Sequence, residues 1–265
     1  MLATAHPVCA QVTAQVTPVK YNLTVKPGEP TGRDVSVMNQ GTNPVIVRVR
    51  LSDWTLSPEG QLALAPLGST ANTLDSLVQF EPAEFSLGPG EAGLVHVTLR
   101  LPLGGPATRW GVLLSEVRPA VPRPAALGPR AIAELGTTLY LSRTPADLIR
   151  ADVIGMSADP LGGDSLSIAV RIRNAGERHF YVRGDLVLSD STGVRVQDGS
   201  FGTGVVLPGG ERSFAWTCHT AWKPGRYTVT ASMDTGEPDL MVAEATFQWP
   251  PRGPSQVPIA EGSPH

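Results

Sequence analysis

Residues 35–41 read VSVMNQG, and residues 170–176 read VRIRNAG. In both stretches alternate apolar residues precede Asn-x-Gly, a pattern typical of a β-strand with one buried face that runs into a turn. Asn tolerates the left-handed backbone region and Gly adopts positive φ without steric cost. Each stretch therefore predicts the end of one strand and the start of the turn to the next.

A second landmark also occurs twice. Residues 87–91 read LGPGE and residues 207–211 read LPGGE, and each precedes another alternating stretch. Two landmarks repeated in the same order indicate two related units better than one large sheet.

The composition favours strands over helices throughout the chain. The 265 residues include 28 Gly and 25 Pro, about one residue in five, and these cost roughly 1 and 3 kcal/mol in a helix interior. Apolar alternation recurs with turn residues about every ten positions, which is typical of sandwiches. We predict an all-β protein of two tandem immunoglobulin-like β-sandwich domains.

The segment SRTP at residues 142–145 follows one strand pattern and precedes a second series of strands. We therefore expect an N-terminal domain over residues 15–143 and a C-terminal domain over residues 148–249. Residues 118–130 hold four prolines and are expected to form a long loop. Residues 250–265 are rich in Pro, Gly and Ser, which predicts a disordered tail.

Residues 1–10 end in Val8-Cys9-Ala10, small residues of the kind a signal peptidase reads. We interpret this segment as a signal-peptide remnant and expect a periplasmic or otherwise exported protein; an ordinary terminus is the alternative. Cleavage after Ala10 would leave Cys218 as the single cysteine.

Charge and motifs exclude several classes of function. The net charge is −3 with no basic run, which argues against a nucleic-acid partner. We expect no transmembrane helix, because no apolar stretch approaches about 18 residues. No protease, hydrolase or phosphate-loop motif is present, and the five His and two Cys lack metal-ligand spacing. We expect no enzyme activity, no catalytic or metal-binding residue and no cofactor.

Cys218 lies on the strand face that it shares with Phe214 and Trp216, so it is predicted to be a buried, inert thiol. His96 stands between Val95 and Val97 and is predicted to point to solvent.

The succession of landmarks resembles a known family. Lys26-Pro-Gly, the 35–41 strand, Asp53-Trp54, the 87–91 turn and a strand over residues 111–119 occur in the order found in bacterial PapD-like periplasmic pilus chaperones. Ile132–Arg143 resembles the last strand of their first domain. The resemblance covers about residues 15–145, and residues 148–249 resemble only a generic second immunoglobulin-like domain.

The resemblance implies a site and a partner. In that family the last strand lends apolar side chains to an incomplete pilin subunit by strand addition, and a basic pair anchors the subunit's terminal carboxylate. Here the edge strand would be residues 131–141. Lys20 lies where the first basic residue falls, whereas Thr137 or Thr138 stands in place of the second. The implied partner-binding residues are Lys20, Ala131, Ile132, Ala133, Leu135 and Arg143.

We therefore expect a non-enzymatic, chaperone-like protein that binds a pilin-like or surface protein subunit. The alternative is a structural or adhesive cell-surface module without chaperone activity, which the missing second basic residue favours. A third hypothesis is an enzyme accessory domain that binds carbohydrate through exposed tryptophans, for which the candidates are Trp54, Trp110, Trp222 and Trp249.

Overall fold

The computed structural model describes residues 12–120, 132–144, 149–162, 164–219 and 222–250, together with the backbone of 255–257 and 259–260. The chain forms two compact units, Met1–Trp54 with Leu64–Ala146, and Thr55–Ala63 with Asp147–His265. All regular structure in the described residues is β-strand, which confirms the predicted all-β fold class. Within these residues, no helix has the length and apolar character needed to cross a membrane.

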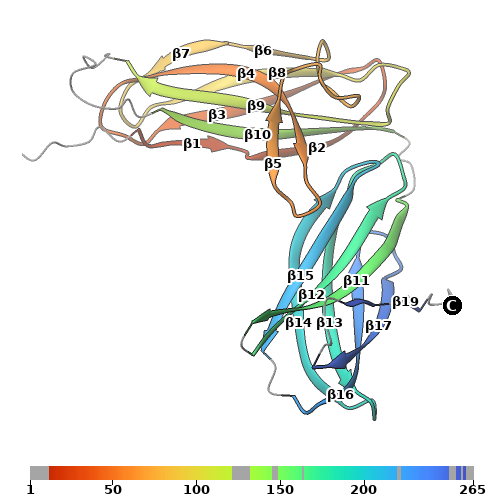
Figure 1. The fold of residues 1–265 in the computed structure, drawn as a ribbon. Helices are drawn as coiled ribbons and strands as arrows, with labels where there is room; N and C mark the ends of the chain where they lie inside the picture. Colours follow the sequence, from red (N-terminus) through yellow and green to blue (C-terminus); the bar gives the residue numbers. More distant parts are fainter. Residues whose placement is uncertain are drawn as a thin grey trace, which may run out of the picture. The chain divides into compact units, whose positions relative to one another are not determined.

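The first unit is a sandwich of two sheets (Figure 1). One sheet is antiparallel and has the order β1 (Ala14–Thr17), β3 (Pro30–Asn39), β8 (Ala92–Arg100), β6 (Val78–Glu81). The other has the order β2 (Lys20–Val25), β10 (Ala133–Arg143), β9 (Thr108–Pro119), β4 (Val45–Leu56), β5 (Leu62–Ala65), with β7 (Glu84–Leu87) paired to β4.

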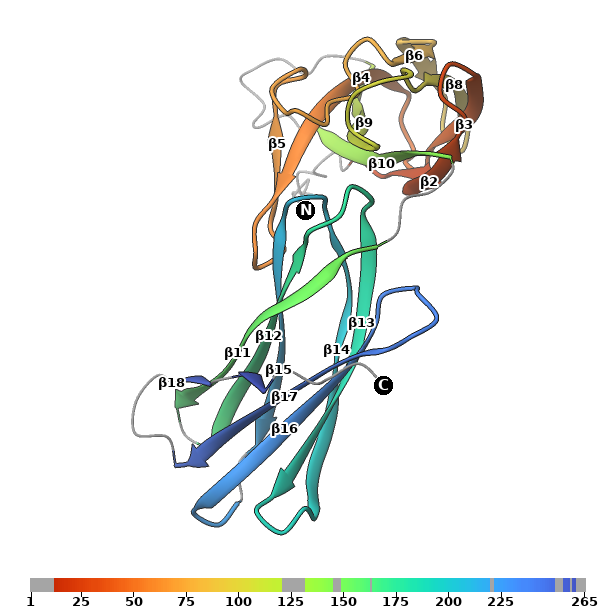
Figure 2. The ribbon, with the colours of Figure 1, turned by 90° about the vertical axis from the view of Figure 1, so that its right-hand side faces the viewer.

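The second unit is also a two-sheet sandwich (Figure 2). Its first sheet has the order β15 (Glu211–His219), β12 (Ser165–Asn174), β11 (Ala151–Gly162), β18 (Ser255–Val257). Its second sheet has the order β14 (Arg195–Val206), β13 (Phe180–Asp190), β16 (Gly225–Asp234), β17 (Met241–Trp249), β19 (Ile259–Ala260).

Alternation along the strands builds a separate core in each unit. On β8 the side chains of Val95, Val97 and Leu99 are at most 1% exposed. Between them His96 is 62% exposed, and its Nδ1 lies 2.5 Å from Oδ1 of Asp34 on β3. The predicted outward direction of His96 is therefore confirmed, and its partner is the acidic residue directly opposite it in the ladder.

In the Asn-x-Gly motif of the first unit, the buried side chain of Asn39 makes several hydrogen bonds to the backbone. The side chain of Asn39 is fully buried, and its Nδ2 donates to the carbonyls of Asn43 at 2.9 Å and Gly88 at 3.0 Å. Its Oδ1 accepts from the backbone N–H of Gly41 at 3.0 Å. The first landmark thus binds directly to the 87–91 turn, which is the second landmark.

The second copy repeats this arrangement in the second unit. Asn174 is also fully buried, and its Nδ2 donates to the carbonyls of Arg178 at 2.9 Å and Val206 at 3.1 Å. Its Oδ1 accepts from the N–H of Gly176 at 2.9 Å. The sequence repeat is therefore a repeat of three-dimensional structure.

Two short stretches of the predicted disordered tail, residues 255–257 and 259–260, have backbone pairing in the structure. Within residues 250–265, β18 pairs with β11 and β19 pairs with β17, both antiparallel. The composition of the tail predicted disorder because it lacks a buried face of its own. The backbone nonetheless forms ladders, because two sheet edges of the second unit supply the donors and acceptors.

Candidate functional site

The predicted edge strand β10 is an edge over only part of its length. It pairs antiparallel with β9 from Ala133 to Ser142, and parallel with β2 from Thr138 onward. Within the residues that the structure describes, no strand pairs with the second side of β10 from Ala133 to Thr137. The sequence predicted an edge over residues 131–141. The structure corrects this range, since residues 138–141 lie inside the sheet between two partners.

A change of sheet by the N-terminal strands sets the end of this open edge. β1 ends at Thr17 in one sheet and β2 begins at Lys20 in the other, with Pro18 between them. Proline has no N–H to donate to a ladder, so it suits this interruption. The hydroxyl of Thr137 donates to the Pro18 carbonyl at 2.7 Å, and the N–H of Thr138 donates to the Val19 carbonyl at 3.0 Å.

The apolar residues expected to meet a partner lie at the open edge with different exposures. Ala133 and Leu135 are half-buried and pack against the rim of the first unit's core. Ile132 is 57% exposed. Ala131 lies outside the described residues. The edge therefore combines unpaired backbone with a short apolar rim.

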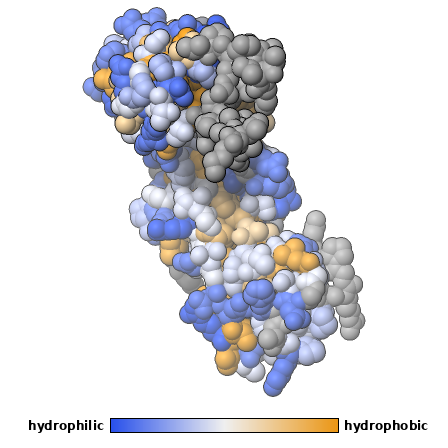
Figure 3. Space-filling view, turned by 90° about the vertical axis from the view of Figure 1, so that its left-hand side faces the viewer, coloured by the Kyte–Doolittle hydropathy of each residue, from blue (hydrophilic) through white to orange (hydrophobic). Residues whose placement is uncertain are grey.

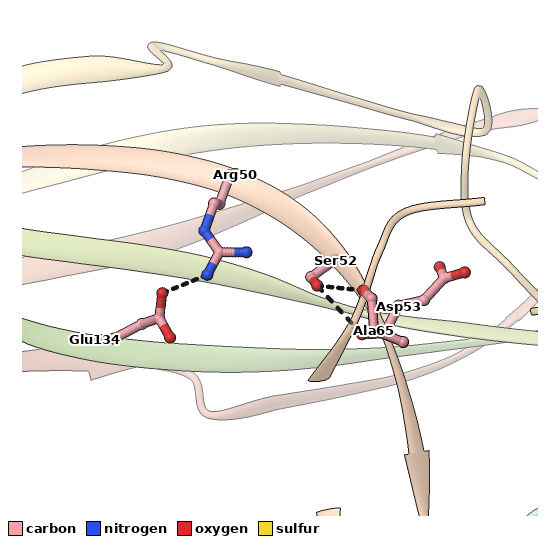
Figure 4. Close-up of polar contacts among 5 residues, drawn as sticks. All are labelled: Arg50, Ser52, Asp53, Ala65 and Glu134. Carbon is pink, nitrogen blue, oxygen red and sulfur yellow. Dashed lines mark hydrogen bonds and ion pairs between the residues drawn. The ribbon is translucent and has the colours of Figure 1, made fainter. Parts of the chain in front are cut away.

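An ion pair on the outer face of this edge was not foreseen from the sequence. A guanidinium nitrogen of Arg50 on β4 lies 2.5 Å from a carboxylate oxygen of Glu134 on β10, and the contact spans β9 (Figure 4). Close by on β4, the Ser52 hydroxyl donates to the Ala65 carbonyl at 2.8 Å and ties β5 to the sheet (Figure 4). The two charged residues are 84 positions apart, so no local pattern could predict their pairing.

The two basic residues among the implied partner-binding residues, Lys20 and Arg143, lie apart. Lys20 is opposite Thr138 in the β2–β10 ladder, whereas Arg143 is opposite Val25. Five ladder positions correspond to about 16 Å along a strand. Lys20 therefore lies next to the open edge, and Arg143 lies at the far end of β10. Of the two positions at which the second basic residue of the family could fall, Thr138 lies opposite Lys20 and Thr137 is fully buried.

The Asp53-Trp54 landmark serves the fold. Asp53 is fully buried and accepts hydrogen bonds from the N–H of Thr70 at 3.0 Å and the hydroxyl of Thr73 at 2.7 Å. Trp54 is 1% exposed and makes an edge-to-face contact with Tyr140 on β10, with ring centroids 5.9 Å apart. Asp53 thus anchors the loop that contains Thr70 and Thr73, and Trp54 packs against β10.

The four candidate tryptophans are buried or half-buried. Trp54 and Trp110 are buried, so they offer no face to an external sugar ring. Trp222 and Trp249 pack on each other at 5.5 Å and against the core of the second unit. The carbohydrate-binding interpretation required exposed tryptophans, and none of these four residues is in the exposed class.

Cys218 lies in the core of the second unit. Cys218 is 1% exposed, as predicted, and burial raises the pKa of its thiol from 9.0 to about 11. Its Sγ lies 3.5 Å from the Leu166 carbonyl as a weak donor. In the same part of the chain no group of three or more His, Cys, Asp or Glu side chains is placed to hold a metal ion.

Exposed apolar side chains are spread over both units. On the face in Figure 3 they form small separate patches among polar residues. The exposed large apolar residues of the two units include Val19, Leu94, Leu103, Ile132, Leu161, Leu240 and Val242. The open stretch of β10 thus offers unpaired backbone rather than a large apolar area, as do strands at other sheet ends such as β6, β14 and β15.

No protein-family model and no curated protein sequence matches the chain. Among solved structures, the YadV chaperone aligns at 11% identity with a TM-score of 0.45, covering 88% of this chain and 99% of that one. The chaperone–tip adhesin complex of CFA/I fimbriae aligns at 10% identity and a TM-score of 0.48, over 91% and 100% of the two chains. The CsuC-CsuE chaperone–tip adhesion subunit complex from Csu pili of Acinetobacter baumannii aligns at 13% identity and a TM-score of 0.47, over 88% and 98%.

Proposed function

We propose that this protein is a non-enzymatic, periplasmic chaperone-like protein that binds an extracytoplasmic, pilin-like subunit by β-strand addition at the open edge of β10. The observation that supports this function most directly is the open stretch Ala133–Thr137, which has a strand on one side only among the described residues. An exposed row of N–H and C=O groups is a template for pairing with another chain.

The ends of the open stretch would define the register of an added strand. At one end, the carbonyls of Pro18 and Val19 accept hydrogen bonds from Thr137 and Thr138, so these two residues block the next positions along β10. An incoming strand therefore ends beside Lys20, whose ammonium group is suited to a carboxylate there. At the other end Ile132 would contact apolar side chains of the partner.

The half-buried Leu135 connects the proposed edge to the core of the first unit. Its side chain packs on the core rim, so a strand added beside it would bury more of the same apolar surface. Backbone pairing would then supply affinity, and the pockets for alternate side chains would supply specificity.

Affinity purification of the full chain from periplasmic extract of its source cells tests this function. We expect one extracytoplasmic partner, identified by mass spectrometry, to co-purify with the unsubstituted chain and to slow amide exchange at residues 134–137. Ile132→Asp and Leu135→Asp should each abolish recovery. Leu94→Asp is the matched control, because Leu94 is 52% exposed on the other sheet while Ile132 is 57% exposed. Equal recovery with all three variants would contradict strand addition at β10.

A structural or adhesive module is the second candidate. The observation that favours it is that Thr137 is buried and bonded to Pro18, so no basic residue stands beside Lys20 at that position. If this candidate is correct, the open edge stays unoccupied in extracts, and amide exchange at residues 134–137 is the same with and without them.

A further inference from the structure

In the second unit, short strands from the C-terminal residues of the chain cover one edge of each sheet. β18 pairs with Met156–Ala158 of β11, and β19 pairs with Glu244–Ala245 of β17. β11 and β17 are the last long strands of their sheets at the ends where β18 and β19 are added. We call residues 255–257 and 259–260 the C-terminal edge segment. It adds one short strand to each sheet.

The position of β18 coincides with the regular part of β11. The ladder of β11 with β12 has irregularities at Val153/Gly155 and at Pro160/Gly162. Bulges and proline disturb the outward row of hydrogen-bonding groups and thereby protect an edge from other chains. Between the two irregularities, Gly155–Asp159 is regular and has neither form of protection. β18 covers the centre of this stretch.

The ladders of the C-terminal edge segment are short. They join three residues to β11 and two residues to β17, whereas β16 and β17 pair from Gly225 to Met233. A hydrogen bond contributes only about 0.5 to 1.5 kcal/mol net, so such ladders open far more often than the sheets that they border. The covered edge is therefore accessible without unfolding of the unit.

We propose that the C-terminal edge segment is a displaceable intramolecular strand covering a second strand-accepting edge, Gly155–Asp159 of β11. The ligand class of this edge is an extended peptide that pairs antiparallel, as β18 does. The segment is held near its edge by the chain itself, so it excludes competing strands at an effective concentration on the order of millimolar. This inference concerns the second unit alone and does not depend on partner binding at β10.

The full chain with Gln256→Pro and Val257→Pro tests the proposal. Adjacent strand residues alternate their N–H groups between the two sides, so this double change removes an N–H that faces β11 in either register. The matched control is Gly262→Pro with Ser263→Pro, two positions later in the sequence than β19. The probe is a synthetic peptide of residues 251–262.

In the 256/257 variant, amide exchange at Met156–Ala158 should be at least about 10-fold faster than in the unsubstituted chain. The peptide should bind this variant saturably and one to one, and about 10-fold or more weakly to the unsubstituted chain and to the control. Unchanged exchange, equal binding to all three proteins, or no binding to the variant would overturn the proposal. Failure of the variant to fold would also overturn it, because the segment would then be an integral part of the sandwich.

Discussion

The hydroxyl of Thr137 on β10 donates a 2.7 Å hydrogen bond to the carbonyl of Pro18, the residue between β1 and β2. The side chain of Thr137 is fully buried. Its hydrogen bond reaches the residue at which the chain passes from one sheet to the other. It also marks the last residue of the open edge, since β2 pairs with β10 from Thr138 onward. The length of the candidate site is thus defined by one side-chain contact between distant segments.

Thr137→Val should destabilise the first unit by about 1 to 3 kcal/mol, because the near-isosteric valine leaves the Pro18 carbonyl without its donor. Urea unfolding of the full chain measures the change. Thr138→Val is the matched control, since its hydroxyl makes only a 3.4 Å contact with the Val19 carbonyl. An equal loss in both variants would show that the Thr137 bond has no special role.

Asn39→Ala and Asn174→Ala should each lower stability by about 2 to 4 kcal/mol, since each change leaves several buried backbone groups unpaired. The effect should be local to the unit that carries the change. Amide exchange of the full chain distinguishes the two: Asn39→Ala should accelerate exchange on β3, and Asn174→Ala on β12. If either variant accelerated exchange equally on both strands, the two Asn side chains would not act independently.

Cys218 should resist thiol reagents in the native state at pH 8, because it is 1% exposed and burial keeps the thiol protonated. Reaction of the Cys9→Ser chain, in which Cys218 is the single thiol, with a chromogenic disulfide reagent in native buffer and in urea measures the difference. We expect full reaction only after unfolding. Rapid native reaction would contradict the buried position.

The same thiol should make stability depend on pH in the alkaline range. Its pKa is about 11 in the folded chain and 9.0 as the ordinary value, so the unfolded chain loses this proton first. The stabilising contribution is complete below pH 9 and is lost as the pH rises toward 11. Cys218→Ala should lack this part of the slope, and an identical slope in both proteins would contradict the assignment.

Several features of this protein followed from local sequence. The alternation of Val95, His96 and Val97 specified a half-buried strand, because neighbouring strand residues point to opposite faces whatever lies further away. The Asn-x-Gly motifs specified two related turns, but not through the positive φ that we expected, since neither the Asn nor the Gly of either motif adopts it. In both turns the Asn Oδ1 accepts a hydrogen bond from the N–H of the Gly two residues later, which is a property of the Asn side chain itself. The burial of Cys218 followed from the same alternation.

The extent of the open edge, the Arg50–Glu134 ion pair and the covering of β11 by β18 were decided only by the tertiary structure. Each depends on which distant segments become neighbours, and strand pairing uses backbone groups that every residue except proline carries. Pro18 lies at the change of sheet and lacks an N–H for pairing, but this local property does not show which strand pairs next. The alternation of side chains depends on a few neighbouring residues, whereas the strand that pairs with a sheet edge depends on how the whole chain folds.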